Sequence, residues 1–156
     1  MQNNSSNKRS TSTDKLINLH SIVWWVLVVA WMGFAFLVSS TTGDQVNTGE
    51  GVLGQIYQSL LALQVQVVGS ELNILSPFLH FMEYFVLGIL LSYALRQHVS
   101  IKRAFIVAIV IASAYGILDE IHQYFVPGRD CDPLDWFIDL LGASFGALIA
   151  FFIQNR

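Results

Sequence analysis

The chain has 156 residues, of which 54% are hydrophobic and only 12% are charged, and its formal net charge is −3. Soluble domains carry about 25% charged residues, so this composition excludes both a water-soluble globule and a disordered chain. A single cysteine excludes a disulfide framework within the chain. The eight basic residues are scattered rather than clustered, so no nucleic acid is expected as a partner. The composition is that of a small integral membrane protein.

The N-terminal region combines a polar tail with a long apolar run. Residues 1–15 are polar and are predicted to be a disordered cytoplasmic tail. Residues 17–39 carry no charge apart from the titratable His20, and they are long enough to cross a bilayer as a helix. A secretory signal peptide is the alternative. The run exceeds the usual apolar region of about 7–15 residues and no A-x-A cleavage site follows, which favours an uncleaved span.

The next segment, residues 41–73, is polar and rich in glycine. Within residues 53–68, apolar side chains recur at helical spacing opposite glutamines and a serine. This stretch is too short and too polar to span a membrane. It is predicted to be an amphipathic helix on the membrane surface, with a re-entrant insertion as the alternative.

Three further apolar runs are predicted to span the membrane, at about residues 76–95, 104–123 and 133–153. Prolines near the start of the first and last of these runs suit the first helical turn. The predicted fold class is therefore an all-α membrane protein with four transmembrane helices, formed by residues 16–156.

Two glycines of the last span, Gly142 and Gly146, have a G-x-x-x-G spacing. This spacing permits close helix approach and predicts a homo-oligomer contact. A chance spacing in a glycine-rich span is the alternative.

The charged residues divide between the two sides of the four-span arrangement. Ten of the eleven acidic residues fall on one side, and seven of the eight basic residues fall on the other: Lys8, Arg9, Lys15, Arg96, Lys102, Arg103 and Arg156. The positive-inside rule makes the basic side cytoplasmic and places both termini there. The function is therefore expected at the outer face.

Several polar residues on the acidic side lie within predicted spans. Uncompensated acids cost about 2.5–3.5 kcal/mol at the centre of a span, so they are expected to face one another in a shared pocket. They share helix faces at spacings of three, four or seven residues. The second span carries His80 and Glu83, the third Asp119, Glu120, His122 and Gln123, and the fourth Asp132, Asp135 and Asp139, while Arg129 lies in the last loop. A mutually satisfied polar plug between the helices is the alternative.

These residues are assigned three candidate roles. Imidazole and carboxylate pairs three residues apart are suited to a divalent metal, which makes a metal the candidate cofactor. The candidate metal ligands are His80, Glu83, Asp119 and His122. The candidate catalytic residues are Glu83, Asp119, Glu120 and His122. The candidate substrate-binding residues are Gln123, Arg129, Asp135 and Asp139.

The sequence resembles the VanZ-like family over about residues 76 to 150. The resemblance rests on the run from His80 to Phe85, on Ala114-Tyr115, on the block from Asp119 to Arg129 (D-E-x-H-Q-x-F-V-P-G-R), and on Asp135 followed by the two glycines. It implies a small multi-span protein of the bacterial cytoplasmic membrane. The founding member lowers susceptibility to teicoplanin-type lipoglycopeptides. This chain departs from the family by having Ser76-Pro77 where an Asp-Lys pair is frequent, so a cation near the mouth of the pocket is missing. It also has Asp139 where asparagine is frequent and Asp132 near where a small hydroxyl residue is frequent, and these two changes make the site more acidic.

The function predicted from these features is to act on or bind a lipid-linked or lipidated molecule of the cell envelope. The expected partners are membrane lipids or a lipid-linked envelope precursor. The enzymatic form of this hypothesis is a metal-assisted hydrolase or transferase acting on a lipid-linked phosphate or glycolipid. A non-catalytic binding or scaffold role is the first alternative, and a proton or cation pathway is the second.

Overall fold

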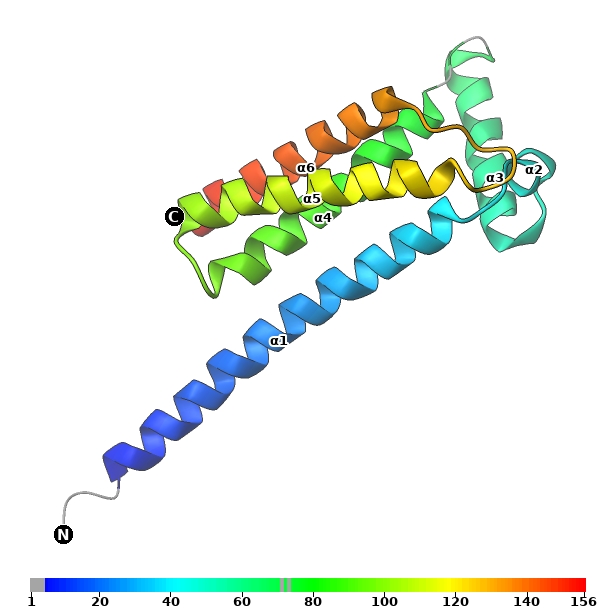
Figure 1. Cartoon of the computed structure of the whole chain (residues 1–156). Coiled ribbons are helices and arrows are strands. Elements are labelled where there is room, and N and C mark those ends of the chain that lie inside the picture. The colour runs from blue at the N-terminus through cyan, green and yellow to red at the C-terminus, as the bar shows by residue number, and fades with distance from the viewer. Residues whose placement is uncertain (1–4, 71, 73) are drawn as a thin grey trace.

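The computed structural model describes residues 5–70, 72 and 74–156, with side-chain environments from Leu19 onward. Residues 1–4 of the predicted tail, and Glu71 and Asn73 of the polar segment 41–73, lie outside this part. The described residues form helices and no strand (Figure 1). The helices are α1 (Ser5–Ser39), α2 (Gly43–Thr48), α3 (Gly51–Val68), α4 (Leu75–Arg96), α5 (Ile101–Gln123) and α6 (Pro133–Gln154).

Four helical segments are long and apolar enough to cross a membrane. They are Leu19–Ser39 within α1, and the whole of α4, α5 and α6. The prediction of an all-α protein with four membrane-spanning helices is thereby confirmed. Successive spans alternate in direction, so the start of α1 and the end of α6 lie toward the same end of the molecule (Figure 1). We call this the basic end, and the opposite end, which holds α2, α3 and the α5–α6 loop, the pocket end.

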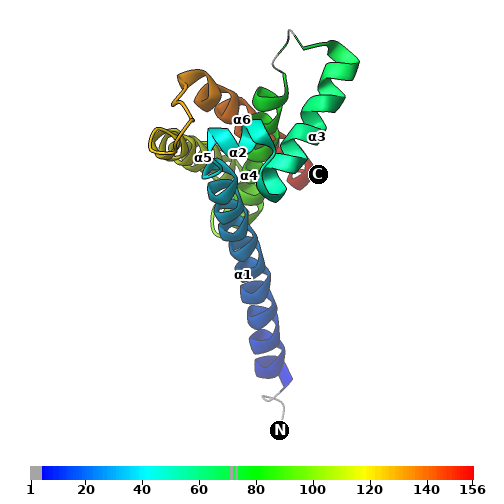
Figure 2. The ribbon, with the colours of Figure 1, turned by 90° about the vertical axis from the view of Figure 1, so that its right-hand side faces the viewer.

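The first helix begins earlier than the sequence predicts. α1 starts at Ser5, within the segment expected to be a disordered tail, and continues unbroken to Ser39. Residues 5–15 contain neither glycine nor proline, so nothing in this stretch ends a helix that the apolar run has already nucleated. The first turns project beyond the bundle at the basic end (Figures 1 and 2).

Helices α4 and α6 approach each other closely because glycines line their contact. A Cβ added at Gly142 or Gly146 would overlap the backbone carbonyl oxygen of Phe81 or Phe85 on α4. Gly88 of α4 approaches the backbone of α6 in the same way. Both glycines of the G-x-x-x-G motif are therefore buried against α4 within one chain. The homo-oligomer stays a prediction.

The first helix is attached to this bundle through side-chain hydrogen bonds to backbone. Trp31 Nε1 donates to the carbonyl oxygen of Glu83 on α4 at 2.9 Å. From α5, the hydroxyl of Tyr115 donates to the carbonyl oxygen of Met32 at 2.6 Å. Both bonds lie in the half of α1 nearer the pocket end, so they fix the position of that half.

The chain between α1 and α4 folds back over the pocket end. α2 begins with a capping box, in which Thr42 and Gln45 bond reciprocally to each other's backbone N–H. This short helix was not predicted. α3 coincides with the amphipathic helix predicted over residues 53–68, and its placement along the membrane surface stays a prediction. At its far end, Gln64 accepts from Leu75 N at 2.7 Å and so caps α4, which has no side-chain cap of its own.

A glycine contact joins this region to the α5–α6 loop. Gly43 N donates to the carbonyl oxygen of Pro127 at 3.0 Å. Gly128 has a φ of 74°, in the left-handed region that favours glycine, and its backbone lies directly against Gly43. The contact holds Arg129, the next residue, beside the ends of α1 and α3.

Candidate functional site

His80 is the residue at which three helices meet. It lies in the second turn of α4, and its Nδ1 lies 3.1 Å from Asp139 Oδ1 on α6. Its Nε2 lies 3.7 Å from Asp135 Oδ2, one turn earlier on α6. The imidazole is 11% exposed and Asp139 is fully buried. Among the described residues, these are the two contacts that meet the distance of an ion pair.

Glu120 brings α5 into the same cluster. One of its carboxylate oxygens accepts from Asp132 N at 2.8 Å, so it ties the end of α5 to the start of α6. One ligand atom from each of His80, Glu120 and Asp139 lies within 4.8 Å of the other two. We call these three residues the His80 cluster. Asp132 itself caps α6 by accepting from Leu134 N, as its position before Pro133 predicts.

Several buried polar atoms around this cluster have no hydrogen-bond partner among the described residues. Two of them belong to the cluster itself, Glu120 Oε1 and Asp139 Oδ2, and the others nearby are Tyr84 Oη and Asp119 Oδ1. Glu120 is 4% exposed and Tyr84 is 1% exposed. An unsatisfied buried polar group costs about 1–3 kcal/mol, and native structures contain few of them. Their concentration around His80 makes this cluster the candidate site.

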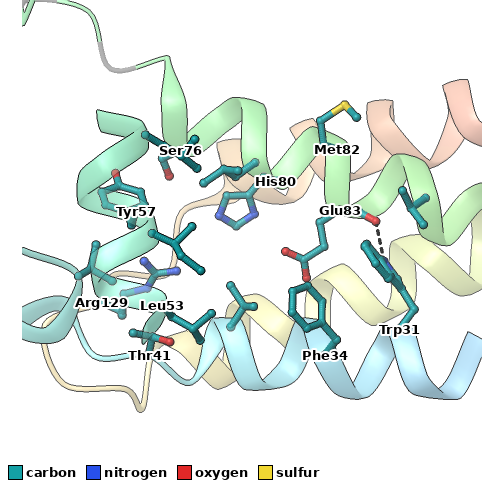
Figure 3. A pocket seen from close by; sticks show the side chains of 16 residues that line it. Trp31, Phe34, Thr41, Leu53, Tyr57, Ser76, His80, Met82, Glu83 and Arg129 are labelled. Carbon is teal, nitrogen blue, oxygen red and sulfur yellow. Dashed lines mark hydrogen bonds between the residues drawn. The ribbon is translucent and has the colours of Figure 1, made fainter. Parts of the chain in front are cut away.

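A pocket of about 390 Å³ opens beside the cluster, between α1, α3 and α4 (Figure 3). Its walls are mostly apolar, and its titratable or charged side chains include His80, Glu83 and Arg129, with Arg129 and Glu83 on either side of His80 (Figure 3). The apolar and aromatic lining residues are Trp31, Phe34, Val38, Val46, Leu53, Ile56, Tyr57, Leu60, Leu79, Met82 and Val86, and Thr41 and Ser76 complete the set.

The only basic side chain of this pocket is Arg129. Its guanidinium points toward the space between Tyr57, Leu53 and His80 (Figure 3). In the described part of the chain Arg129 forms no ion pair, and its Nε has no hydrogen-bond partner. Arg129 is half-buried, and a guanidinium in this position without a carboxylate partner is suited to an anionic group of a ligand.

The structure separates the metal ligands predicted from the sequence. Glu83 lines the pocket but is not part of the His80 cluster. Asp119 accepts from Gln123 Nε2 at 3.2 Å, so these two buried residues pair with each other. His122 points to α1, where its Nε2 lies 3.0 Å from Ser40 Oγ and its ring lies against Phe36. Of the predicted set, only His80 belongs to the cluster that the structure assembles.

The predicted catalytic and substrate-binding residues also fall into two groups at different places in the structure. Glu120, Asp135 and Asp139 lie around His80, whereas Glu83 and Arg129 face the neighbouring pocket. His80 lines the pocket as well, so it connects the two groups of residues.

The apolar half of the site was not predicted. Trp31, Phe34 and Val38 line the pocket from α1, and their spacing of three and four residues was the available signal, since it places them on one face. The amphipathic pattern over residues 53–61 indicated an apolar face on α3 without indicating what that face covers. Tyr84, buried with an unpartnered hydroxyl, was also missed as a site residue.

Fold and site together define the class of protein: a helical membrane protein with four spans, in which buried acidic and histidine side chains meet at one end of a helix bundle. The chain belongs to the VanZ/LLP1 family, whose family model matches residues 24–154. The matched range includes every site residue described above and confirms the resemblance seen in the sequence. No curated protein and no solved structure matches the chain.

Proposed function

We propose that this protein binds an amphiphilic molecule of the cell envelope, either lipid-linked or lipidated, whose head group carries an anion. The observation that carries the proposal is the unpaired Arg129 guanidinium that lines an otherwise mostly apolar pocket. The shared chemistry of the candidate ligands is a hydrocarbon chain joined to a phosphate or carboxylate.

The walls of the pocket suit the hydrocarbon part of such a molecule. Aromatic and aliphatic side chains of α1 and α3 line its length, and several of them, including Phe34, Ile56 and Leu60, are also exposed on the surface of the molecule. In a membrane protein this surface meets lipid chains, so an apolar chain in the pocket is continuous with the bilayer.

The polar side chains of the pocket suit a head group with both an anion and hydrogen-bond donors. Arg129 supplies charge-assisted donors to the anion, while Glu83 accepts from hydroxyl or amine groups. The distribution of basic residues along the chain supports an outward-facing pocket, where head groups of envelope precursors and lipidated antibiotics are found. We therefore place the function at the outer leaflet of the bacterial cytoplasmic membrane.

The proposal is tested with a polyprenyl phosphate and the polyprenol of the same chain length. Purified protein in detergent is incubated with each lipid, and bound molecules are counted by native mass spectrometry. We expect the phosphate to bind at least tenfold more tightly than the alcohol. Arg129→Gln should remove this difference, because a hydrogen bond to a charged group contributes about 1.5–3 kcal/mol.

Arg103→Gln is the matched control, since Arg103 is an exposed arginine at the basic end, far from the pocket. This variant should retain the preference for the phosphate. Equal binding of the two lipids by the unsubstituted protein, or an unchanged preference in Arg129→Gln, would contradict the proposal.

A further inference from the structure

We infer that His80, Glu120 and Asp139 form a binding site for one divalent transition-metal ion of the Zn²⁺ or Mn²⁺ type. The three side chains come from α4, α5 and α6, so an ion bound by them would join all three helices of the bundle. The site lies next to the pocket proposed for the amphiphile, but metal binding does not require that ligand.

The spacing of the three side chains suits a single ion. Their ligand atoms lie within 4.8 Å of one another. Metal–ligand bonds of about 2.0–2.2 Å place the ligand atoms of a tetrahedral ion about 3.3–3.6 Å apart, and ligands on opposite sides of an ion at most about 4.4 Å apart. Small rotations of the carboxylates therefore bring all three into coordination without movement of the helices.

Unpartnered oxygen atoms provide an independent indication. Glu120 Oε1 and Asp139 Oδ2 belong to side chains that are more than nine-tenths buried, and neither atom has a hydrogen-bond partner among the described residues. The other oxygen of each carboxylate is engaged, by Asp132 N for Glu120 and at 3.1 Å from His80 Nδ1 for Asp139. Each carboxylate is thus oriented through one oxygen and has the second available to a cation, as metal-binding carboxylates are.

The charges in and around the His80 cluster also favour a bound cation. Asp135 and Asp139 lie beside His80, with Glu120 close by, and Arg129 is held in the neighbouring pocket. Burying several carboxylates around one imidazole is costly unless a cation or additional protons compensate them. A mixed set of one imidazole and two carboxylates favours Zn²⁺ or Mn²⁺, whereas Mg²⁺ and Ca²⁺ prefer oxygen ligands alone.

The test uses the full chain, purified in detergent, treated with a chelator and titrated with Co²⁺, whose visible absorption reports coordination by nitrogen and oxygen ligands. We expect saturation at one Co²⁺ per chain, displacement by Zn²⁺, and a higher melting temperature with metal than without it. Glu120→Gln and Asp139→Asn should each weaken binding at least tenfold. No lipid is added, so the result is independent of whether the amphiphile binds.

Asp119→Asn and Glu83→Gln are the controls, because both residues are nearby acids outside the His80 cluster. They should bind Co²⁺ like the unsubstituted protein. If Glu120→Gln and Asp139→Asn fail to fold, His80→Gln takes their place, with loss of the nitrogen-dependent Co²⁺ spectrum as the readout. The inference is overturned if the unsubstituted protein binds no stoichiometric metal, which would mean that protons alone compensate the carboxylates. It is also overturned if the Asp119 and Glu83 variants, rather than the cluster variants, lose the ion.

Discussion

Single residues decide how closely α4 and α6 approach. The backbone of α4 lies where side chains would stand at Gly142 and Gly146, and small buried residues, Ala143 and Ala147, continue the same surface. This close approach brings Asp139 against His80, since both residues lie near the same helix contact. The glycines therefore determine the geometry of the site as well as the packing of the bundle.

Alanine at Gly142 or Gly146 should separate the two helices and destabilise the protein. The added methyl group would meet a backbone carbonyl, which cannot move aside as a flexible side chain can. Overpacking of this kind costs about 1–3 kcal/mol, so the melting temperature in detergent should fall measurably. Gly33→Ala is the control, because nothing lies within 4 Å of its added Cβ and alanine favours a helix. A fall in Gly33→Ala as large as in the other two would show that the contact is not the cause.

The sequence does not show which face of α5 is turned toward the site. Spacing placed Asp119 and His122 on one face of a helix and predicted them as partners for His80. The next residue, Glu120, points about 100° away from Asp119, and the structure shows that this is the face turned to His80 and Asp139. Spacing gives the angle between side chains on one helix, but packing against the other helices sets the rotation of the helix itself.

Among the elements, the corner between α1 and α2 supports the α5–α6 loop. The contact of Gly43 with Pro127 and Gly128 is made by backbone atoms, so it holds the chain just before Arg129. Two segments more than 80 residues apart in the sequence therefore position one functional side chain.

Alanine at Gly128 should displace Arg129 and weaken binding of the anionic lipid. The left-handed φ disfavours any Cβ by about 1–2 kcal/mol, and Gly43 lies only 3.2 Å from the position of the new atom. We expect the preference for polyprenyl phosphate over polyprenol to fall several-fold. Gly51→Ala is a stringent control, because Gly51 has the same left-handed φ but open space around it. An equal loss of preference in both variants would attribute the effect to backbone strain in general.

The elements themselves were largely predictable. Each membrane span follows from a long, mostly apolar run, and the observed helices of α4, α5 and α6 differ from the predicted spans by a few residues at their ends. α3 followed from its amphipathic pattern. α2 was missed although Thr42 and Gln45 have the spacing of a capping box, because six residues among glycines are too few to show a periodic pattern. The apolar pocket could not be predicted, since it depends on how α3 folds back against α1 and α4.

At the scale of the whole molecule, the orientation in the membrane is testable with the native cysteine. Cys131 is exposed and lies in the α5–α6 loop at the pocket end. If the positive-inside rule holds, a membrane-impermeant maleimide should label Cys131 in intact cells. A variant with Cys131→Ser and Gln97→Cys, which moves the thiol to the basic end, should be labelled only after the cells are opened. The reverse pattern would place the pocket on the cytoplasmic side.

The whole molecule should also influence susceptibility to antibiotics that carry a lipid chain. Expression in a sensitive Gram-positive host is expected to lower susceptibility to teicoplanin and to leave susceptibility to vancomycin, which lacks the chain, unchanged. At matched membrane levels, Arg129→Gln should remove the protection and Arg103→Gln should keep it. Protection that survives Arg129→Gln, or that extends equally to vancomycin, would argue against the pocket as its origin. If expression gives no protection, this chain does not share the role of the founding family member in resistance.

Some apolar residues that line the pocket are also exposed on the surface of the molecule, so membrane lipids affect the measured affinity of the pocket for its ligand. A ligand that enters the pocket from the lipid phase is already dissolved in the bilayer. The surrounding phospholipids therefore compete with it for the pocket. Occupancy then depends on the mole fraction of the ligand in the membrane and not on its amount per volume of buffer. Adding inert lipid to a fixed quantity of protein and ligand should release the ligand, whereas diluting the whole suspension with buffer should release almost none.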